Sequence, residues 1–291
     1  MLTNRLGLPQ AIVDAVSNDP YTRGASDISV TQLIQPPYQR QLRLQHEPIE
    51  DASDRIWSLV GQVGHGIVER AYPRAYTDIA AKMTPKEVHD TYGVVAERRL
   101  FMKVNGWTVS GQFDVIENGH LQDYKFTSVW SVIGDTKKEW INQLNLLRLL
   151  ALQEGIDIQR LGIIAILRDW SKGKAMSSDY PRHQIFPIDI PMWSPARAED
   201  YLMERVLAHQ AVNPPVCTDE ERWKREDVFA VMKTGRKSAV KLHEKQGEAA
   251  AHASELGPGH SVVKRPGEFF RCMNYCDVNA ACPAMKTDVG F

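Results

Sequence analysis

Hydrophobic and polar positions follow a strand-like pattern in three consecutive segments in the middle of the chain. The segments and the Asn-Gly pairs that separate them are Val94–Val104, Asn105-Gly106, Trp107–Glu117, Asn118-Gly119 and His120–Val129. An Asn-Gly pair between two such segments favours a tight type I′ turn, because both central residues need positive φ. We therefore expect a three-stranded antiparallel meander.

Helical periodicity precedes and follows this meander. Ser29 and Gln32 have capping-box spacing at the start of a short helix, Ser29–Ile34, that Pro36-Pro37 ends. A helix from about Asp54 to Ala71 has an apolar stripe formed by Ile56, Val60, Val63, Ile67 and Val68. The elements expected after the meander are an apolar helix at about Glu139–Gln153, strands at Arg160–Leu167 and Gln184–Ile190, and a helix from Pro195, capped by Ser194, to about Ala211.

The run Asn213-Pro214-Pro215 is typical of a linker. The segments that follow it predict a small β-β-α-β module that ends on a cysteine knuckle: Val228–Met232, Ser238–Leu242, Gly247–Leu256 and Ser261–Lys264. We therefore expect a large domain at residues 1–212 and a small module at residues 213–291.

The turns also predict which side chains meet. A two-residue loop at Asn118-Gly119 places Asp114 opposite Asp123 and Gln112 opposite Lys125. Cross-strand partners share one face of a sheet, so Asp114, Asp123 and Lys125 should emerge together. The loop at Asn105-Gly106 places Glu97 opposite Asp114, provided that no β-bulge shifts the register.

Carboxylates that lie side by side repel one another, so this face should hold cations. Lys125 supplies one charge, and a divalent ion such as Mg²⁺ is the natural second, because it prefers carboxylate and phosphate oxygens. Such an ion can activate water and neutralise a phosphate under attack, and Lys125 could orient that water or stabilise the developing charge. The alternative interpretation is a solvated sheet face without a metal.

Several short motifs, in order, resemble the signature of the RecB-type PD-(D/E)XK nucleases. They are Ser29-Val30-Thr31-Gln32, Gly64-His65-Gly66-Ile67-Val68-Glu69, Gly111-Gln112-Phe113-Asp114, Gln122-Asp123-Tyr124-Lys125 and Gln143. The resemblance implies an α/β (α+β) fold, a restriction-endonuclease-like core in which helices flank a central mixed sheet. It also implies that Asp114, Asp123, the Tyr124 carbonyl and His65 bind Mg²⁺ or Mn²⁺, with Lys125 as the catalytic lysine.

Some of these roles have alternatives. An imidazole ligand at His65 suits Mn²⁺, but a helix histidine can also pair with Glu69 one turn later. Gln143 would orient the site, or it is a polar residue at the solvent edge of its helix. The family often has tyrosine four residues after this glutamine, where the chain has Leu147. This departure puts the contact of that tyrosine with DNA in doubt.

Four cysteines lie in the C-terminal part: Cys217, Cys272, Cys276 and Cys282. The family resemblance implies an iron–sulfur cluster (4Fe–4S), held by one distant cysteine and a C-terminal trio. Here the first gap of the trio is one residue longer than usual, and Pro36-Pro37 stands where relatives have their distant cysteine. We expect Cys217 to replace that cysteine. Zn²⁺ is the second interpretation and four packed thiols the third.

A basic excess near the start of the module is consistent with a strip that contacts a nucleic-acid backbone, although such a run is more often a solvated face. Its residues are Arg222, Lys224, Arg225, Lys233, Arg236, Lys237 and Lys241. The whole chain has a net charge of −1, which excludes only a histone-like coat. It has neither an apolar run of membrane-spanning length nor a secretory h-region. We expect a cytoplasmic protein of a bacterial or phage-infected cell, with no membrane partner.

The expected function is metal-dependent hydrolysis of DNA phosphodiesters, foremost as an exonuclease in recombination, repair or phage DNA processing. A structure-specific or restriction-type endonuclease is the alternative within the enzyme class. A non-catalytic DNA-binding or assembly protein on a nuclease fold is the alternative outside it. The family implies DNA as a partner, together with a helicase or a single-strand annealing or recombination protein.

Overall fold

The computed structural model describes residues 2–18, 24–48, 50–71 and 78–288, without the side chains of residues 67–69 and 286–288. The chain divides into two compact units, Met1–Gln35 with Ile49–Pro214 and Pro36–Pro48 with Pro215–Phe291. The boundary between Pro214 and Pro215 lies two residues after the domain boundary expected at residue 212. The segment Pro36–Pro48 belongs to the second unit, which the sequence did not predict.

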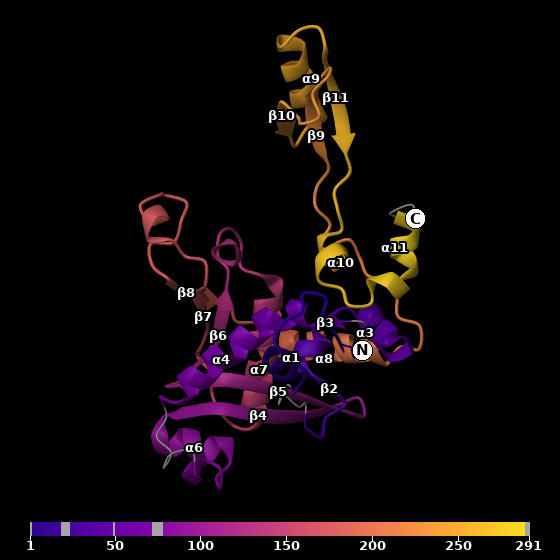
Figure 1. Ribbon diagram of the computed structural model, residues 1–291. Coiled ribbons are helices and arrows are strands. Elements are labelled where there is room, and N and C mark those ends of the chain that lie inside the picture. The colour runs from indigo at the N-terminus through magenta and orange to yellow at the C-terminus, as the bar shows by residue number, and fades with distance from the viewer. Residues whose placement is uncertain (1, 19–23, 49, 72–77, 289–291) are drawn as a thin grey trace. The chain divides into compact units, whose positions relative to one another are not determined.

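The first unit is built around a mixed β-sheet (Figure 1). The strands of this sheet are β2 (Ile28–Ser29), β4 (Val94–Val104), β5 (Trp107–Glu117), β6 (His120–Thr127), β7 (Arg160–Leu167) and β8 (Ile185–Ile190). Two short strands, β1 (Leu2–Thr3) and β3 (Glu50–Asp51), pair with each other in a separate sheet. The helices of the first unit include α1 (Gln10–Ser17), α2 (Val30–Leu33), α4 (Ile56–Glu69), α6 (Pro85–Tyr92), α7 (Lys138–Gln153) and α8 (Pro195–Gln210). The short 3-10 helices are η1 (Ala52–Arg55), η2 (Val129–Ser131) and η3 (Lys172–Lys174).

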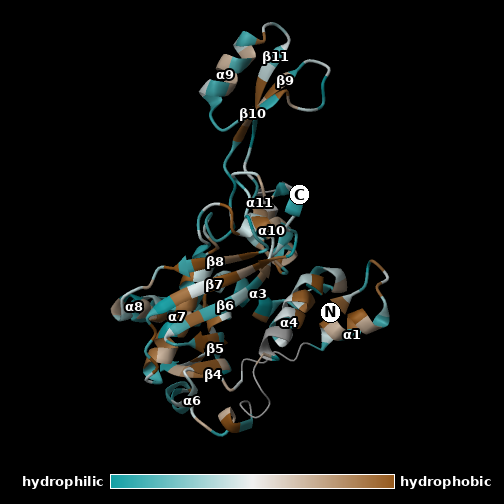
Figure 2. Ribbon diagram, turned by 90° about the vertical axis from the view of Figure 1, so that its left-hand side faces the viewer, coloured by the Kyte–Doolittle hydropathy of each residue, from teal (hydrophilic) through white to brown (hydrophobic). Residues whose placement is uncertain are grey.

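The predicted meander is confirmed. Strands β4, β5 and β6 are antiparallel neighbours, and both Asn-Gly turns have positive φ at each central residue, for example 48° at Asn118 and 73° at Gly119. Strand β6 then pairs in parallel with β7, and β7 pairs antiparallel with β8. The result is a central mixed sheet with helices packed against it, and Figure 2 shows hydrophobic residues along its strands.

The ladder between β5 and β6 is shorter than the sequence predicted. It ends at Val115 and Gln122, so Asp114 is not paired with Asp123, and the predicted register beyond this point is wrong. Asp114 Oδ2 instead accepts the backbone N–H of Tyr124 at 2.6 Å, so the carboxylate replaces a backbone acceptor and the two strands separate. Gln112 pairs with Arg99 of β4 and has no ladder partner on β6.

Strand β2 occupies the other end of the same edge of β5. Ile28 pairs with Val109 and Ser29 with Ser110, in parallel. Among the described residues, the edge of β5 between Ser110 and Val115 is therefore open in the sense that no strand pairs with it there. The capping box of α2 is confirmed, because Ser29 and Gln32 each accept the backbone N–H of the other.

Helix α7 packs against five strands of the sheet. Eight of its residues are buried, and it contacts β4, β5, β6, β7 and β8. Helix α4 contacts β6, but its predicted apolar stripe is partly wrong, since Val60 is 39% and Val63 57% exposed. The side chains of Ile67 and Val68, which complete that stripe, lie outside the described residues.

The second unit contains the expected β-β-α-β module. Strands β9 (Val228–Lys233), β10 (Lys241–His243) and β11 (His260–Arg265) form an antiparallel sheet in the order β10-β9-β11, and α9 (Gln246–Glu255) packs against it. The remaining elements are α3 (Pro37–Gln45), α10 (Phe270–Asn274), η4 (Asn279–Ala281) and α11 (Pro283–Asp288). None of the helices over the described ranges is both long and apolar enough to cross a membrane.

Candidate active site

Helix α4 approaches β6 through a glycine. A Cβ atom added to Gly64 would lie 2.1 Å from Cζ of Phe126, so a larger residue here would require the helix or the Phe126 ring to move. The next residue, His65, makes an edge contact with the same ring, at 5.9 Å between centroids. Its Nδ1 lies 3.4 Å from Asp114 Oδ2. The Gly64-His65 pair thus brings an imidazole to the carboxylate on β5.

A second glycine fixes the distance between β5 and α7. A Cβ atom on Gly111 would lie 2.4 Å from Cδ2 of Leu147, so the absence of a side chain lets the helix pack closely on the strand. Leu147 is 1% exposed. The position where the RecB-type nucleases often have tyrosine is therefore part of the hydrophobic core in this chain.

Three potential metal ligands meet where β5 and β6 separate. Ligand atoms of His65, Glu97 and Asp114 all lie within 4.8 Å of one another. Over the parts of the chain that the structure describes, this is the one such group of three histidine, cysteine or acidic side chains. It combines α4 with the consecutive strands β4 and β5, which follow that helix in the sequence.

Glu97 joins this group through an unusual backbone conformation. Its φ is 50°, and it makes no ladder pair, although Ala96 and Arg98 on either side pair with Val115 and Phe113. The β4–β5 ladder keeps the same register on both sides of Glu97, with no residue inserted. Glu97 therefore lies beside Asp114, as the sequence predicted. A positive φ at glutamate is strained, and such strain is often found at functional sites.

Gln112 is a site residue that the sequence predicted only as a strand partner of Lys125. Its Nε2 donates to Glu97 Oε2 at 2.8 Å, and its Oε1 accepts from Arg99 at 2.9 Å. Gln112 therefore holds the Glu97 carboxylate in place. Its position two residues before Asp114, in the Gly111–Asp114 motif, was the available signal.

Asp123 forms the second half of the site with Lys125 and Gln143. Lys125 Nζ lies 2.7 Å from Asp123 Oδ2, and Gln143 Nε2 of α7 donates to Asp123 Oδ1 at 3.2 Å. Asp123 is 3% exposed. The ion pair with Lys125 is close, but its direction does not satisfy hydrogen-bond geometry, and Oδ2 has no other donor. This buried oxygen remains available to a cation.

Burial and the neighbouring carboxylates favour the protonated form of Asp114. Burial raises the pKa of Asp114 to about 8, and the negative charges of Asp123 and Glu97 also raise this pKa. The hydrogen bond from the Tyr124 N–H and the positive charge of Lys125 act in the opposite direction. Burial lowers the pKa of His65, and the positive charge of Lys125 also lowers it, whereas the negative charge of Asp123 acts in the opposite direction. A neutral imidazole beside acidic oxygens is a suitable ligand set for a divalent cation, and a bound cation would restore the ionised form of Asp114.

The structure thus brings together the side chains proposed for the metal and catalytic site. His65, Glu97 and Asp114 form one group, and Asp123, Lys125 and Gln143 the other, with the Tyr124 N–H joining them. The alternative pairing of His65 with Glu69 concerns a side chain outside the described residues.

The four cysteines line one cavity in the second unit. Cys217, Cys272, Cys276 and Cys282 share it with Tyr38, Gln39 and Leu42 of α3. Gln39 Nε2 lies 3.6 Å from Cys276 Sγ, and Arg43 pairs with Asp277 at 2.7 Å. Helix α3 therefore lies beside the cysteines although it contributes none.

The sulfur atoms do not form a group of three as compact as a bound zinc ion would impose. Tetrahedral Zn–S bonds of about 2.3 Å would hold the sulfurs about 3.8 Å apart. Among the described residues, no three cysteines have sulfurs within 4.8 Å of one another. Burial and neighbouring negative groups raise the pKa of Cys217 to about 12 and also raise the pKa of Cys276. The ionised form of these cysteines therefore needs a positively charged group nearby to be stable.

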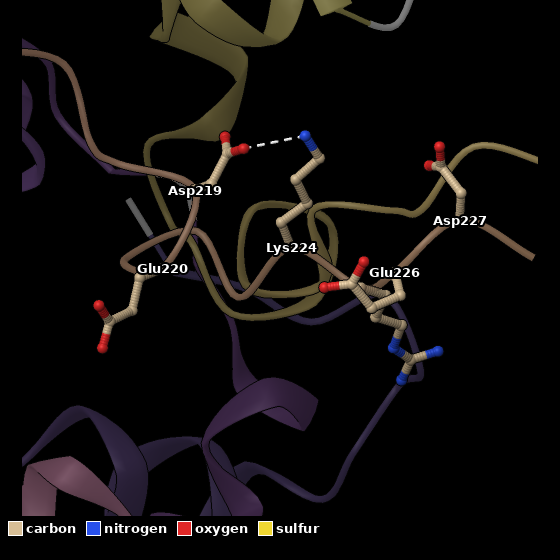
Figure 3. Close-up of a pocket in the computed structure, with 6 residues that line it drawn as sticks. Asp219, Glu220, Lys224, Glu226 and Asp227 are labelled. Carbon is tan, nitrogen blue, oxygen red and sulfur yellow. Dashed lines mark hydrogen bonds and ion pairs between the residues drawn. The ribbon is translucent and has the colours of Figure 1, made fainter. Parts of the chain in front are cut away.

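The structure separates the predicted basic strip into two parts. Near the cysteines, Lys224 pairs with Asp219 at 2.9 Å (Figure 3), and Arg222 and Arg225 stack on Phe269 and Phe270. In contrast, the β9–β10 hairpin carries four exposed cations that form no ion pair with a described carboxylate: Lys233, Arg236, Lys237 and Lys241.

Comparisons with known proteins do not assign the chain to a family. No family model matches it, and no curated protein matches it. A solved structure titled "Crystal structure of SSO0001" aligns with 69% of this chain and 86% of its own, at 13% sequence identity and a TM-score of 0.42.

Proposed function

We propose that this protein is a metal-dependent DNA nuclease of the PD-(D/E)XK type. The observation that supports it most is the convergence of His65, Glu97 and Asp114 within 4.8 Å, beside the Asp123–Lys125 pair. The five side chains come from α4, β4, β5 and β6 and meet at the open edge of β5. Carboxylates and a neutral imidazole can hold a divalent cation, and a lysine can stabilise charge on a phosphate, so this set of groups suits phosphodiester hydrolysis. The choice of DNA as substrate rests on the family resemblance.

Each residue has a role in the proposed reaction. Asp114, Asp123, Glu97 and His65 would hold the cation, with the Tyr124 carbonyl as a further ligand. When bound, the cation supplies Lewis acidity toward the phosphate and the attacking water. Lys125 stabilises the negative charge that develops on the phosphate, and Gln143 keeps Asp123 in position.

In the net reaction, a water oxygen forms a bond to phosphorus and the bond to the leaving sugar oxygen breaks. The water loses a proton and the leaving oxygen gains one.

The experiment is incubation of the protein with end-labelled linear DNA and with circular DNA, in Mg²⁺, Mn²⁺ or EDTA. We expect metal-dependent degradation of linear DNA, as for an exonuclease; nicking of circles would favour the endonuclease alternative. Asp123→Ala and Lys125→Ala should each reduce turnover by at least about 100-fold with nearly unchanged DNA affinity. Full activity in either variant would overturn the site, and tight DNA binding without cleavage in any metal would favour the non-catalytic alternative.

A further inference from the structure

Two tryptophans are strongly exposed beside the end of β6. Trp57 of α4 is 57% exposed, and Trp130 of η2, which follows β6, is 78% exposed. A tryptophan has a large apolar surface whose burial is favourable, and exposed aromatic groups often mark a contact with another molecule. Neither ring has a role in the catalytic group described above.

The segment after β7 links the two tryptophans. Arg168 N donates to Thr127 O at 2.9 Å, so this residue lies at the end of β6. Its guanidinium carbon lies 3.9 Å from the centroid of the Trp57 ring. Asp169 Oδ1 accepts the backbone N–H of Val129 at 2.7 Å, immediately before the second tryptophan. The Asp169 carboxylate is therefore already engaged.

A second cation belongs to the same surface. Lys137 Nζ donates to Ser131 Oγ, next to Trp130, at 2.9 Å. Lys137 keeps exposed surface, but desolvation of its ammonium lowers its pKa. The positive charges of Arg168 and Lys125 also lower this pKa, whereas the negative charge of Glu139 raises it. In the described part of the chain, neither Arg168 nor Lys137 forms an ion pair with a carboxylate. A negatively charged ligand would relieve this repulsion.

The surface adjoins the candidate active site on two elements. On α4, Trp57 precedes His65 by two turns, or about 12 Å along the axis. In the β6–β7 ladder Lys125 pairs with Ala165, and Arg168 follows about 10 Å further along the chain. A strand that enters the active site from this side would pass over both tryptophans.

We propose that Trp57, Trp130, Arg168 and Lys137 form a stacking platform for a single-stranded segment of nucleic acid. The bases stack on the tryptophan rings and the phosphates face the two cations. Bases in a duplex already stack on one another, so exposed rings favour an unpaired strand. A protein partner would account for the tryptophans but not for two cations without carboxylate partners. The platform concerns the strand that enters the proposed nuclease site, and so rests on that function.

The test measures binding separately from cleavage. Fluorescein-labelled oligo-dT and a blunt duplex are titrated with the protein in EDTA, while tryptophan fluorescence is recorded with unlabelled oligo-dT. We expect quenching by oligo-dT, and oligo-dT affinity about fivefold or more weaker in Trp57→Ala and in Trp130→Ala. Trp57→Phe should retain most of the affinity. Leu207→Ala, which changes an exposed apolar residue of α8, is the matched control and should bind like the wild type.

The outcomes separate the two proposals. If oligo-dT binding is the same in the wild type, Trp57→Ala and Trp130→Ala, the platform is wrong even if DNA is cleaved. If binding depends on both rings but no metal supports cleavage, the platform stands and the nuclease proposal fails. Equal losses for oligo-dT and blunt duplex in both variants would overturn the preference for an unpaired strand. Circular dichroism and melting curves check that the variants fold, and Trp130→Ala changes a side chain with little packing to lose.

Discussion

Gly64 of α4 lies directly against the ring of Phe126 of β6. Because a Cβ atom would lie 2.1 Å from Phe126 Cζ, this contact sets the distance between the helix and the strand. His65 follows Gly64, so the same contact determines how far the imidazole lies from Asp114. A glycine without any chemistry of its own thus positions a proposed metal ligand.

We expect Gly64→Ala to displace either α4 or the Phe126 ring and to lower the free energy of unfolding by about 1–3 kcal/mol. Metal affinity should fall as well, because His65 moves with the helix. Urea denaturation and calorimetric metal titration measure the two effects. Gly61→Ala and Gly66→Ala are matched controls in the same helix, since a Cβ atom at either position meets nothing within 4 Å. Equal stability of all three variants would show that the close contact does not matter.

His65→Ala should reduce turnover less than the loss of Asp123, because one ligand of several is removed. Raising the Mn²⁺ concentration should restore part of the activity, since weaker binding can be offset by mass action. Initial rates over a range of Mn²⁺ concentrations test this expectation. A variant that matches the wild type at limiting metal would mean that His65 is a packing residue only.

The stability of the metal-free protein should depend on the ionisation of Asp114. Its pKa is about 8 in the folded protein and about 4 in the unfolded chain. The protonated carboxyl therefore makes its full contribution to stability below pH 4, and this contribution is lost as the pH rises to 8. Asp114→Asn removes this titration. In EDTA, the variant should therefore gain stability relative to the wild type between pH 5 and pH 8.5, as measured by urea unfolding. Parallel curves for the two proteins would contradict the raised pKa.

If the four cysteines hold an iron–sulfur cluster, protein purified without oxygen should be brown and contain iron and acid-labile sulfide. Cys217→Ser should lose both and destabilise the second unit, because bound metal contributes to the folding of small units. Tyr38→Phe is the control, since this residue lines the same cavity without offering a sulfur. Stoichiometric zinc without iron would favour the second interpretation. Absence of both metals, with unchanged stability in Cys217→Ser, would leave four packed thiols.

The cations of the β9–β10 hairpin should contribute to DNA affinity by neutralising phosphates. Replacing Lys233, Arg236, Lys237 and Lys241 with glutamine should weaken binding similarly for all sequences and lower the salt dependence, by about one unit of slope for each phosphate that is no longer neutralised. The variant Lys224→Gln is the control, because that lysine pairs with Asp219. An unchanged salt slope in the fourfold variant would mean that the hairpin is merely solvated.

The sequence by itself determined the elements whose structure depends on near neighbours. Asn105-Gly106 and Asn118-Gly119 adopt the positive φ that a type I′ turn needs, so the three strands between and beside them follow from local turn geometry. The same holds for the Ser29–Gln32 capping box and for the β-β-α-β module. The hairpin register also brought Glu97 beside Asp114.

Only the tertiary structure decided how separate elements meet at the site. The separation of β5 from β6 depends on the Tyr124 N–H bond to a side chain, which no alternation of hydrophobic residues encodes. The exposed face of α4 was misassigned because periodicity identifies a stripe but not what covers it: this helix contacts β6 through Gly64, and Val63 stays exposed. Likewise, a cation's sequence neighbours do not show whether a carboxylate or an aromatic ring lies beside it. These contacts join residues far apart in the chain, so packing between whole elements determines them.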